Sequence, residues 1–581
     1  MTKMRKSTTA NKLILGACLG NCVHVAGTLN FLQLAKAKGY QTKFLGPATP
    51  ISTILDEVEQ TDAPIIGLSY RLTPAAAYGL TQKLKKEVHK RNLTKRTWLF
   101  GGTTPVTEKV RKVGFFDYYF DGNSTDEDVL MFLAADCDPQ QLAEKAHRMD
   151  PVTYATTLLA RMAERKPWPV IRHHFGLPSL EETIQGIVKI ADTKCLDILS
   201  IGPDQNAQQF FFRPNEMKDT VEGAGGVPIR TEKDLRAMYT ASQRGNYPLL
   251  RCYSGTQDLL KWAKLLHKTI HNAWTATPIN WYSVLDGRST RSLTEAIQEN
   301  MNNIAWHGKQ GIPVEVNEPH HWSLRQAHDT IAVASAFWSA FITKSMGVPH
   351  YIAQLMMNTP LGTSPAMDLA KMWAKLALVE SLQDNFFQVI RQVRAGLFSF
   401  PVDLDAAKGQ LAASAYTSMM LEPAIVHVVG FSEADHAATA DDVIKSCKIV
   451  RQVIKECRSG TPNPWLDPQI IARKEQLVSE ASLLLRVLAE LPEDKTPHPL
   501  LNPTTYELAI KQGILDAPGL KGNPIARGRL QTLMIEGACY AVDENGEVLS
   551  ESDRLEVLVP KKLAALEERE KEHEKLVHKI A

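Results

Sequence analysis

Short apolar runs alternate with amphipathic helical stretches along most of this 581-residue chain, and that alternation limits the folds it can adopt. Parallel strands need a crossover between them, so a strand–helix–strand rhythm is typical of parallel α/β sheets. We therefore expect a doubly wound domain of Rossmann or flavodoxin type over residues 1–135. Its predicted strands are 12–18, 40–46, 63–72, 96–102 and 117–122, and its predicted helices are 29–38, 51–60, 74–91 and 105–113.

A second and longer alternation occupies residues 179–460. Its length and rhythm fit a (β/α)8 TIM barrel, which typically has about 250 residues. Residues 136–178 are predicted to form a helical connector between the two domains. Residues 461–581 are predicted to form a helical and α/β extension that includes a charged helix at 560–579. The strands expected in the barrel include 196–203, 247–255, 278–287, 312–322, 348–357 and 424–431.

The composition narrows the class of function. There are 66 basic and 64 acidic residues, a net charge of +2, which argues against nucleic acid or an anionic membrane as a partner. The eight cysteines are scattered without Cys-x-x-Cys pairs, a pattern that favours reduced thiols over zinc or iron–sulfur ligation. No apolar segment resembles a signal peptide or reaches the ~18 residues of a membrane span. We expect a cytoplasmic enzyme.

Polar and glycine residues follow the strands predicted in the first domain. His24 lies in the loop after the first strand, and Ser69 ends the third. The fourth strand ends in a glycine pair, Gly101-Gly102, which leaves a slot free of side chains. Because the carboxyl ends of parallel strands share one edge of the sheet, ligands bind in the crevice there. The sequence predicts a ligand slot with an imidazole beside it.

This arrangement resembles the cobalamin-binding domain of adenosylcobalamin mutases and corrinoid methyltransferases, whose pattern is Asp-x-His-x-x-Gly, then Ser-x-Leu, then Gly-Gly. It is most similar to the small subunit of glutamate mutase (methylaspartate mutase). The resemblance implies that His24 is the lower axial ligand of a corrinoid cobalt. The family's aspartate, which orients the imidazole, falls at Cys22, with Asn21 as the alternative partner. The cofactor-binding residues implied are Asn21, Cys22, His24, Val25, Gly27, Ser69, Leu72, Gly101, Gly102, Gly122 and Ser124.

Charged residues at the predicted carboxyl ends of the barrel strands are the candidates for catalysis. Arg251 and Arg288 suit a carboxylate-bearing substrate, because a guanidinium group pairs with a carboxylate through two parallel hydrogen bonds. Asp286 and Glu318 are candidates for binding an amine or a hydroxyl group. No phosphate-binding glycine loop accompanies the lysines, so pyridoxal phosphate is not expected.

The barrel resembles the large, catalytic subunit of glutamate mutase. Arg251 followed by residues 255–258, Gly-Thr-Gln-Asp, is similar to that family's Arg-His-Gly-Thr-Pro-Asp, whose arginine grips a substrate carboxylate. The family's Thr-Arg motif falls near 204–206, where this chain has no arginine. The glutamate of its Tyr-Glu-Gly-Gly-Gly motif is missing from the corresponding stretch, 281–287. The resemblance implies a related fold with a substrate other than glutamate.

The resulting hypothesis is an adenosylcobalamin-dependent radical mutase that acts on a small carboxylate-bearing amino or hydroxy acid. The small and large subunits of the family would be fused in one chain, and related mutases lead us to expect a homodimer. One alternative is a corrinoid methyltransferase that uses methylcobalamin. The other is a corrinoid-binding protein without catalysis.

Overall fold

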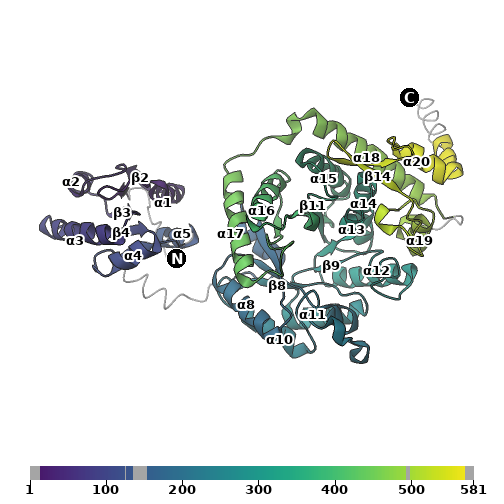
Figure 1. The fold of residues 1–581 in the computed structure, drawn as a ribbon, viewed down its shortest axis with the longest axis horizontal. Helices are drawn as coiled ribbons and strands as arrows, with labels where there is room; N and C mark the ends of the chain where they lie inside the picture. The colour runs from purple at the N-terminus through teal and green to yellow at the C-terminus, as the bar shows by residue number, and fades with distance from the viewer. Residues whose placement is uncertain (1–12, 123, 125, 135–153, 493–496, 570–581) are drawn as a thin grey trace, which may run out of the picture. The chain divides into compact units, whose positions relative to one another are not determined.

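The protein forms two compact α/β units, which divide after residue 153. The computed structural model describes residues 13–122, 124, 126–134, 154–492 and 497–569. Figure 1 shows the helices that surround the strands of each unit. Each unit is described by itself below.

The first unit is a five-stranded parallel sheet in the order β2-β1-β3-β4-β5, as expected for a doubly wound domain. Its strands are β1 (Leu13–Cys18), β2 (Gln41–Phe44), β3 (Ile65–Tyr70), β4 (Thr97–Gly102) and β5 (Tyr118–Phe120). Its helices are α1 (Ala26–Ala37), α2 (Ile51–Thr61), α3 (Pro74–Lys90), α4 (Thr104–Arg111) and α5 (Asp126–Ala134). The strand order reverses beside β1 and β3, and the crevice at such a point is where these sheets bind ligands.

Close packing of α1 on the sheet brings the start of this helix to the carboxyl edge. Gly16 on β1 has no side chain, and a Cβ there would lie 2.9 Å from Thr28 Cγ2 and 2.8 Å from Leu32 Cδ1. Gly67 pairs with Gly16 in the β1–β3 ladder and faces Phe31. These glycines therefore allow α1 to approach β1 and β3 closely, which places Thr28 beside the ends of both strands.

The second unit is an eight-stranded parallel barrel. The strands pair in the order β8-β7-β6-β13-β12-β11-β10-β9, and no ladder joins β8 to β9 in the described part of the chain. They are β6 (Val170–Phe175), β7 (Ile198–Ile201), β8 (Leu249–Cys252), β9 (Thr275–Thr277), β10 (Val314–Val316), β11 (His350–Met356), β12 (Gln388–Arg394) and β13 (Ile425–Val428). The predicted TIM-barrel architecture is confirmed.

Helices follow the barrel strands and form the outer ring seen in Figure 1. They are α7 (Leu158–Arg165), α8 (Leu180–Asp192), α9 (Gln205–Phe210), α10 (Glu232–Ser242), α11 (Leu259–Ile270), α12 (Leu293–Lys309), α13 (Glu318–Leu324), α14 (Asp329–Ser345), α15 (Pro365–Glu380), α16 (Leu404–Met419) and α17 (Ala440–Cys457). Short 3-10 turns lie in the loops at η1 (Pro214–Glu216), η2 (Asp219–Val221) and η3 (Leu397–Ser399).

The barrel differs from the sequence-based expectation at three strands. Strand β6 lies inside 136–178, so the barrel begins before the boundary that we expected at 179. Strand β12 was not expected, because its polar residues interrupt the apolar run. The apolar run 278–287 is a loop after β9, where Ile279 and Trp281 are buried against the core. An apolar run indicates a buried segment, and that segment can be a loop as well as a strand.

The barrel interior is layered. An apolar layer of large side chains fills the end where the strands begin, and a polar layer lies nearer the carboxyl ends. On β6, for example, Val170 belongs to the apolar layer, Arg172 to the polar layer, and His174 lies beyond it, because every second residue faces inward. TIM-barrel active sites lie at the carboxyl ends of the strands. The apolar layer includes Val170, Ile198, Trp274, Ile352, Ile390 and Ile425.

The C-terminal extension packs on the barrel through its long helix, α18 (Pro468–Ala489), which contacts α14 and α15. A two-stranded antiparallel hairpin follows further along the chain. The other elements are η4 (Pro464–Leu466), η5 (Pro499–Leu501), α19 (Pro503–Lys511), η6 (Pro518–Leu520), β14 (Gln531–Ile535), β15 (Ala538–Val542) and α20 (Glu551–Leu558). The charged helix expected at 560–579 is helical to residue 569, and its remainder lies outside the described residues. No described helix is long and apolar enough to cross a membrane.

Candidate functional site

A pocket of about 390 Å³ opens at the carboxyl edge of the first sheet. Its volume falls in the ~300–1,000 Å³ range of small-molecule sites. Seven of the expected cofactor-binding residues line it, and four do not. The lining residues are His24, Gly27, Ser69, Gly101, Gly102, Gly122 and Ser124. The four that do not line it are Asn21, Cys22, Val25 and Leu72.

Three glycines of this pocket are not required by packing. A Cβ added to Gly27 would meet nothing within 4 Å, and one added to Gly101 would meet its nearest atom at 3.9 Å. At Gly122 the nearest atom is Thr104 Oγ1 at 3.7 Å. By contrast, a Cβ on Gly102 would lie 2.8 Å from the Tyr70 carbonyl oxygen. The protein would therefore tolerate side chains at the first three positions, and their absence widens the slot.

Hydroxyl groups line the inner side of the slot. Thr28 Oγ1 donates a hydrogen bond to Ser69 Oγ over 2.7 Å, and Ser69 Oγ contacts Cys18 Sγ at 3.4 Å. Both Thr28 and Ser69 line the pocket. A hydroxyl oxygen accepts as well as donates, so this pair retains hydrogen-bonding capacity for the polar groups of a ligand.

His24 is exposed at the edge of the pocket. Its Nδ1 lies 3.8 Å from Sγ of Cys22, which is fully buried. Asn21 Oδ1 accepts a hydrogen bond from the Tyr70 hydroxyl over 3.1 Å. With Nδ1 directed at Cys22, Nε2 is the ring nitrogen left for a metal ion. A thiol orients an imidazole less firmly than a carboxylate does.

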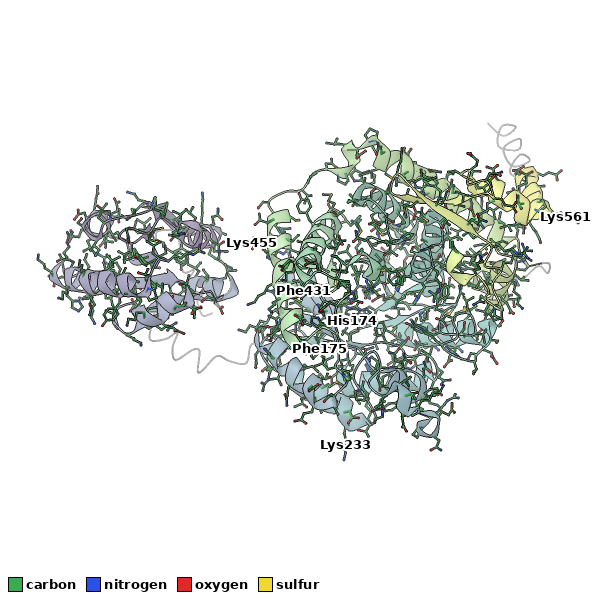
Figure 2. The ribbon with its side chains drawn as sticks, in the orientation of Figure 1. His174, Phe175, Lys233, Phe431, Lys455 and Lys561 are labelled. Atoms are coloured by element: carbon green, nitrogen blue, oxygen red, sulfur yellow. The ribbon has the colours of Figure 1, made fainter. Side chains whose placement is uncertain are left out.

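A second pocket, of about 590 Å³, lies at the carboxyl ends of the barrel strands β6, β7, β12 and β13. His174 and Phe431, labelled in Figure 2, mark this end of the barrel. Glycines form much of the wall, and polar side chains from the barrel interior form the floor. The floor residues are His174, Tyr253, Arg394 and His427. The wall glycines are Gly176, Gly202, Gly223, Gly225, Gly226 and Gly430.

Beneath this floor the barrel carries an excess of positive charge. Arg172 donates hydrogen bonds to Ser200 Oγ at 2.8 Å and to Glu315 Oε2 at 3.2 Å. Arg251 is fully buried, and none of its guanidinium nitrogens has a hydrogen-bond partner among the described residues. Its distance to the same Glu315 oxygen is 3.7 Å. Arg172 and Arg251 thus share one deeply buried carboxylate. Arg394 on the floor above them adds a third guanidinium group, and such a surplus of positive charge attracts an anion.

The two floor histidines are neutral at pH 7. Burial and the nearby Arg172 hold the pKa of His174 and that of His427 well below the usual range. His174 Nε2 lies 2.8 Å from Arg172 Nη2, and a guanidinium group only donates, so the ring proton of His174 is on Nδ1. The His174 ring stacks on Tyr253 with a centroid distance of 5.0 Å and lies 4.8 Å from the His427 ring.

Three of the expected catalytic residues lie elsewhere. Asp286 accepts hydrogen bonds from the backbone N–H groups of Tyr282 and Ser283 at 3.2 and 3.1 Å, and so it organises the loop after β9. Glu318 accepts from the backbone N–H of Ile279 at 2.8 Å and from other donors around it. Arg288 is exposed on the same loop. None of these three lines the barrel pocket, because the buried loop uses the two carboxylates for its own backbone.

The residues that sequence reasoning missed are His174, Arg394 and His427. The signal was present in β6 and β12, where polar residues recur at every second position: Arg172 and His174 on β6, Gln392 and Arg394 on β12. Such an alternation indicates a strand with one polar face, and in a barrel that face points inward. In the described part of the chain, no group of three or more His, Cys, Asp or Glu residues is arranged to hold a metal ion.

The fold and these two pockets define a protein that joins a doubly wound unit, with a pocket at the carboxyl edge of its sheet, to a TIM barrel with a second pocket at the carboxyl ends of its strands. No protein-family model and no curated protein matches the chain. Among solved structures, a cobalamin-binding protein from Desulfitobacterium hafniense DCB-2 is 21% identical over 21% of this chain and 57% of its own, with a TM-score of 0.19. The aligned part is therefore little more than half of that protein.

Two enzymes match the chain more broadly and at lower identity. The YdjI aldolase from Escherichia coli K12 is 11% identical over 50% of this chain and 90% of its own, with a TM-score of 0.25. A 2,3-dimethylmalate lyase is 11% identical over 57% of this chain and 98% of its own, with a TM-score of 0.28. Similarities this distant carry no information on activity, which has to be argued from the two pockets.

Proposed function

We propose that this protein is a corrinoid-dependent enzyme, in which the first unit binds the cofactor and the barrel binds a small carboxylate-bearing substrate. The observation that carries the proposal is the slot of the first unit. Gly27, Gly101 and Gly122 leave space there that packing does not require, and His24 stands at its edge. A corrinoid with its nucleotide tail extended needs both features: a side-chain-free slot and an imidazole for cobalt.

The residues present fit such a cofactor. Ser69 and Thr28 offer hydroxyl groups to a nucleotide tail, and the glycine walls admit its flat base. His24 would bind cobalt through Nε2, and Cys22 would hold the other ring nitrogen weakly. When bound, a corrinoid supplies a reactive cobalt–carbon bond, a chemistry that protein side chains do not provide.

The barrel would bind and orient the substrate. Arg394 lies on the pocket floor, and Arg172 and Arg251 beneath it share the single carboxylate of Glu315, so the remaining positive charge attracts a carboxylate group to this end of the barrel. The neutral imidazoles of His174 and His427 would hydrogen-bond the rest of the substrate without adding charge. An intramolecular rearrangement asks the protein mainly to bind, orient and exclude water, and we therefore propose a mutase that uses adenosylcobalamin.

A methyltransferase that uses methylcobalamin is the second candidate. The neighbour of His24 is the Cys22 thiol, where the mutases carry a carboxylate, so the protein would hold the imidazole less firmly than a mutase does, which favours this second candidate. Substrate-dependent formation of an isomer, followed by mass spectrometry, would support the mutase. Transfer of methyl groups from added methylcobalamin would support the alternative.

The test of corrinoid binding compares two histidines of the first unit. The full-length protein, labelled with 15N-histidine, is mixed with cob(II)alamin, and electron paramagnetic resonance distinguishes the 15N splitting of a ligating histidine from the 14N splitting of the cofactor's own base. We expect histidine splitting in the wild type and in His89→Ala, whose target is an exposed histidine on α3 outside the pocket. His24→Ala should lose the splitting. Absence of corrinoid uptake by the wild type would refute the proposal, and splitting that persists in His24→Ala would refute the ligand assignment.

We also propose a homodimer, on the basis of the charged helix predicted at 560–579. Light scattering of the full-length protein tests it, and a monomer at micromolar concentration would contradict it.

A further inference from the structure

The chemistry of the barrel floor discriminates between substrates that share a carboxylate. The polar groups on the floor are a guanidinium (Arg394), a phenol (Tyr253) and two imidazoles (His174 and His427). No carboxylate lies among them. The deeper Glu315 is occupied by Arg172 and by Trp274 Nε1, which donates to it over 2.8 Å. An ammonium group in this position would find cations and no free carboxylate.

Two carboxylates line the pocket at its outer rim, and neither is well placed for an ammonium group. Asp435 pairs with His436 at 2.5 Å. Glu433 lines the pocket near Arg394, and burial of its carboxyl raises its pKa above the ordinary value, which disfavours the ionised form that an ammonium group needs. An ammonium group bound at Glu433 would also lie near the Arg394 guanidinium, which repels it. The rim therefore does not provide the carboxylate that an ammonium group needs and that the floor lacks.

A hydroxyl group fits the same floor. His427 is buried and neutral, and its Nδ1 has no hydrogen-bond partner among the described residues. His174 carries its proton on Nδ1, because Nε2 accepts from Arg172. A hydroxyl group donates to one nitrogen and accepts from another, whereas an ammonium group only donates. His427 lines the pocket, so its neutral imidazole is placed to hydrogen-bond a ligand hydroxyl group.

We propose that the barrel pocket selects hydroxy acids over the corresponding amino acids, with the carboxylate bound by Arg394 and the hydroxyl by His427 and His174. This inference rests on the proposed function, because it names the substrate class of the same barrel. Tyr253 positions His174 by stacking on it. The selectivity comes from the charge of the floor and not from its shape.

The experiment uses matched ligands that differ in one group. Calorimetric titration of the full-length protein at pH 7.5, without corrinoid, compares three sets: glycolate, acetate and glycine; lactate, propionate and alanine; malate, succinate and aspartate. In at least one set we expect the hydroxy acid to bind about tenfold tighter than the unsubstituted acid, and the amino acid to bind most weakly. An amino acid that binds as tightly as its hydroxy acid, or no binding in any set, overturns the inference.

Single substitutions test which residues recognise the hydroxyl and the carboxylate of the ligand. His427→Phe should remove the preference for the hydroxy acid and leave the affinity for the unsubstituted acid unchanged. His427→Asn, which keeps a hydrogen-bonding side chain at this position, should restore part of the preference for the hydroxy acid. Arg394→Gln should weaken both acids about equally. Glu433→Gln should change neither; if it abolishes binding of an amino acid that the wild type prefers, the inference is wrong. Circular dichroism and thermal melting confirm that each variant is folded.

The corrinoid experiment separates this inference from the function on which it rests. Hydroxy-acid selectivity without corrinoid uptake would refute the corrinoid enzyme and support the chemistry assigned to the pocket. Corrinoid uptake with amino-acid selectivity would do the reverse.

Discussion

The two pockets of this protein are built on opposite principles. The pocket of the first unit is lined by glycines, hydroxyl groups and one exposed histidine, and packing leaves its walls empty. The barrel pocket lies above buried arginines and neutral histidines that interact with one another. Under the proposed function, the first would recognise a ligand mainly by leaving space for it, and the second by an excess of positive charge. Substitutions should therefore affect binding in one pocket and both binding and stability in the other.

The largest expected effect is a difference in the free energy of unfolding between substitutions of two barrel arginines. Arg172 makes hydrogen bonds to Ser200, Gln392 and Glu315, so Arg172→Met leaves buried polar groups unpaired and should destabilise the protein by about 3–5 kcal/mol. Arg251 has no hydrogen-bond partner among the described residues, so Arg251→Met should change stability by ~1 kcal/mol or less. Urea unfolding measures both. Equal losses would show that Arg251 is as firmly integrated as Arg172.

Filling the slot of the first unit should abolish binding and leave the fold intact. Gly101→Leu adds a side chain where the nearest atom to a Cβ is 3.9 Å away, so we expect corrinoid affinity to fall about 100-fold at an unchanged melting temperature. Gly79→Leu is the matched control, because a Cβ at this position would meet nothing within 4 Å and Gly79 lies on α3 outside the pocket. Spectroscopic titration with cobalamin measures the affinity. Unchanged binding in Gly101→Leu would show that the slot is not the site.

Acid should destabilise the barrel more than the first unit. Burial lowers the pKa of His173 and of His307 to about 4, so the unfolded chain takes up their protons between pH 6.5 and 4 and the folded barrel does not. Their contribution is complete above pH 6.5 and is lost as the pH falls towards 4, about 2 kcal/mol each at pH 5. His307→Gln should reduce the pH slope of stability accordingly. The described histidines of the first unit, His24 and His89, are exposed, so its transition should shift less.

The smallest effect should come from the hydroxyl pair of the slot. Ser69→Ala removes the acceptor of the 2.7 Å hydrogen bond from Thr28 and one polar contact for a ligand. We expect corrinoid affinity to fall by a factor of about 5, which corresponds to one hydrogen bond of ~1 kcal/mol. Thr73→Ala, which removes a helix cap on α3, controls for a general loss of stability in this unit. A Ser69→Ala protein with unchanged affinity would place the nucleotide tail elsewhere.

Most of the fold was predictable from the sequence, and the site only in part. All five strands of the first sheet were expected, because each lies between helical stretches and four of them, all but β2, are short apolar runs. In the barrel, β6 and β12 were not predicted, because their inward faces carry polar residues: Arg172, His174, Gln392 and Arg394. The polar residues that make such a strand hard to predict are the same residues that form the site. Polar residues placed inside a barrel break the apolar run by which a strand is recognised.

The sequence by itself determined the two α/β architectures and the position of His24 after the first strand, because local periodicity and glycine placement are properties of short segments. Only the tertiary structure decided the use of each charged group. Asp286 and Glu318 hold a buried loop, whereas His174, Arg394 and His427 meet at one pocket from strands far apart in the chain. The sequence alone does not show whether a given carboxylate or arginine binds a ligand or the protein's own backbone. Long-range burial and hydrogen bonding separate the two cases.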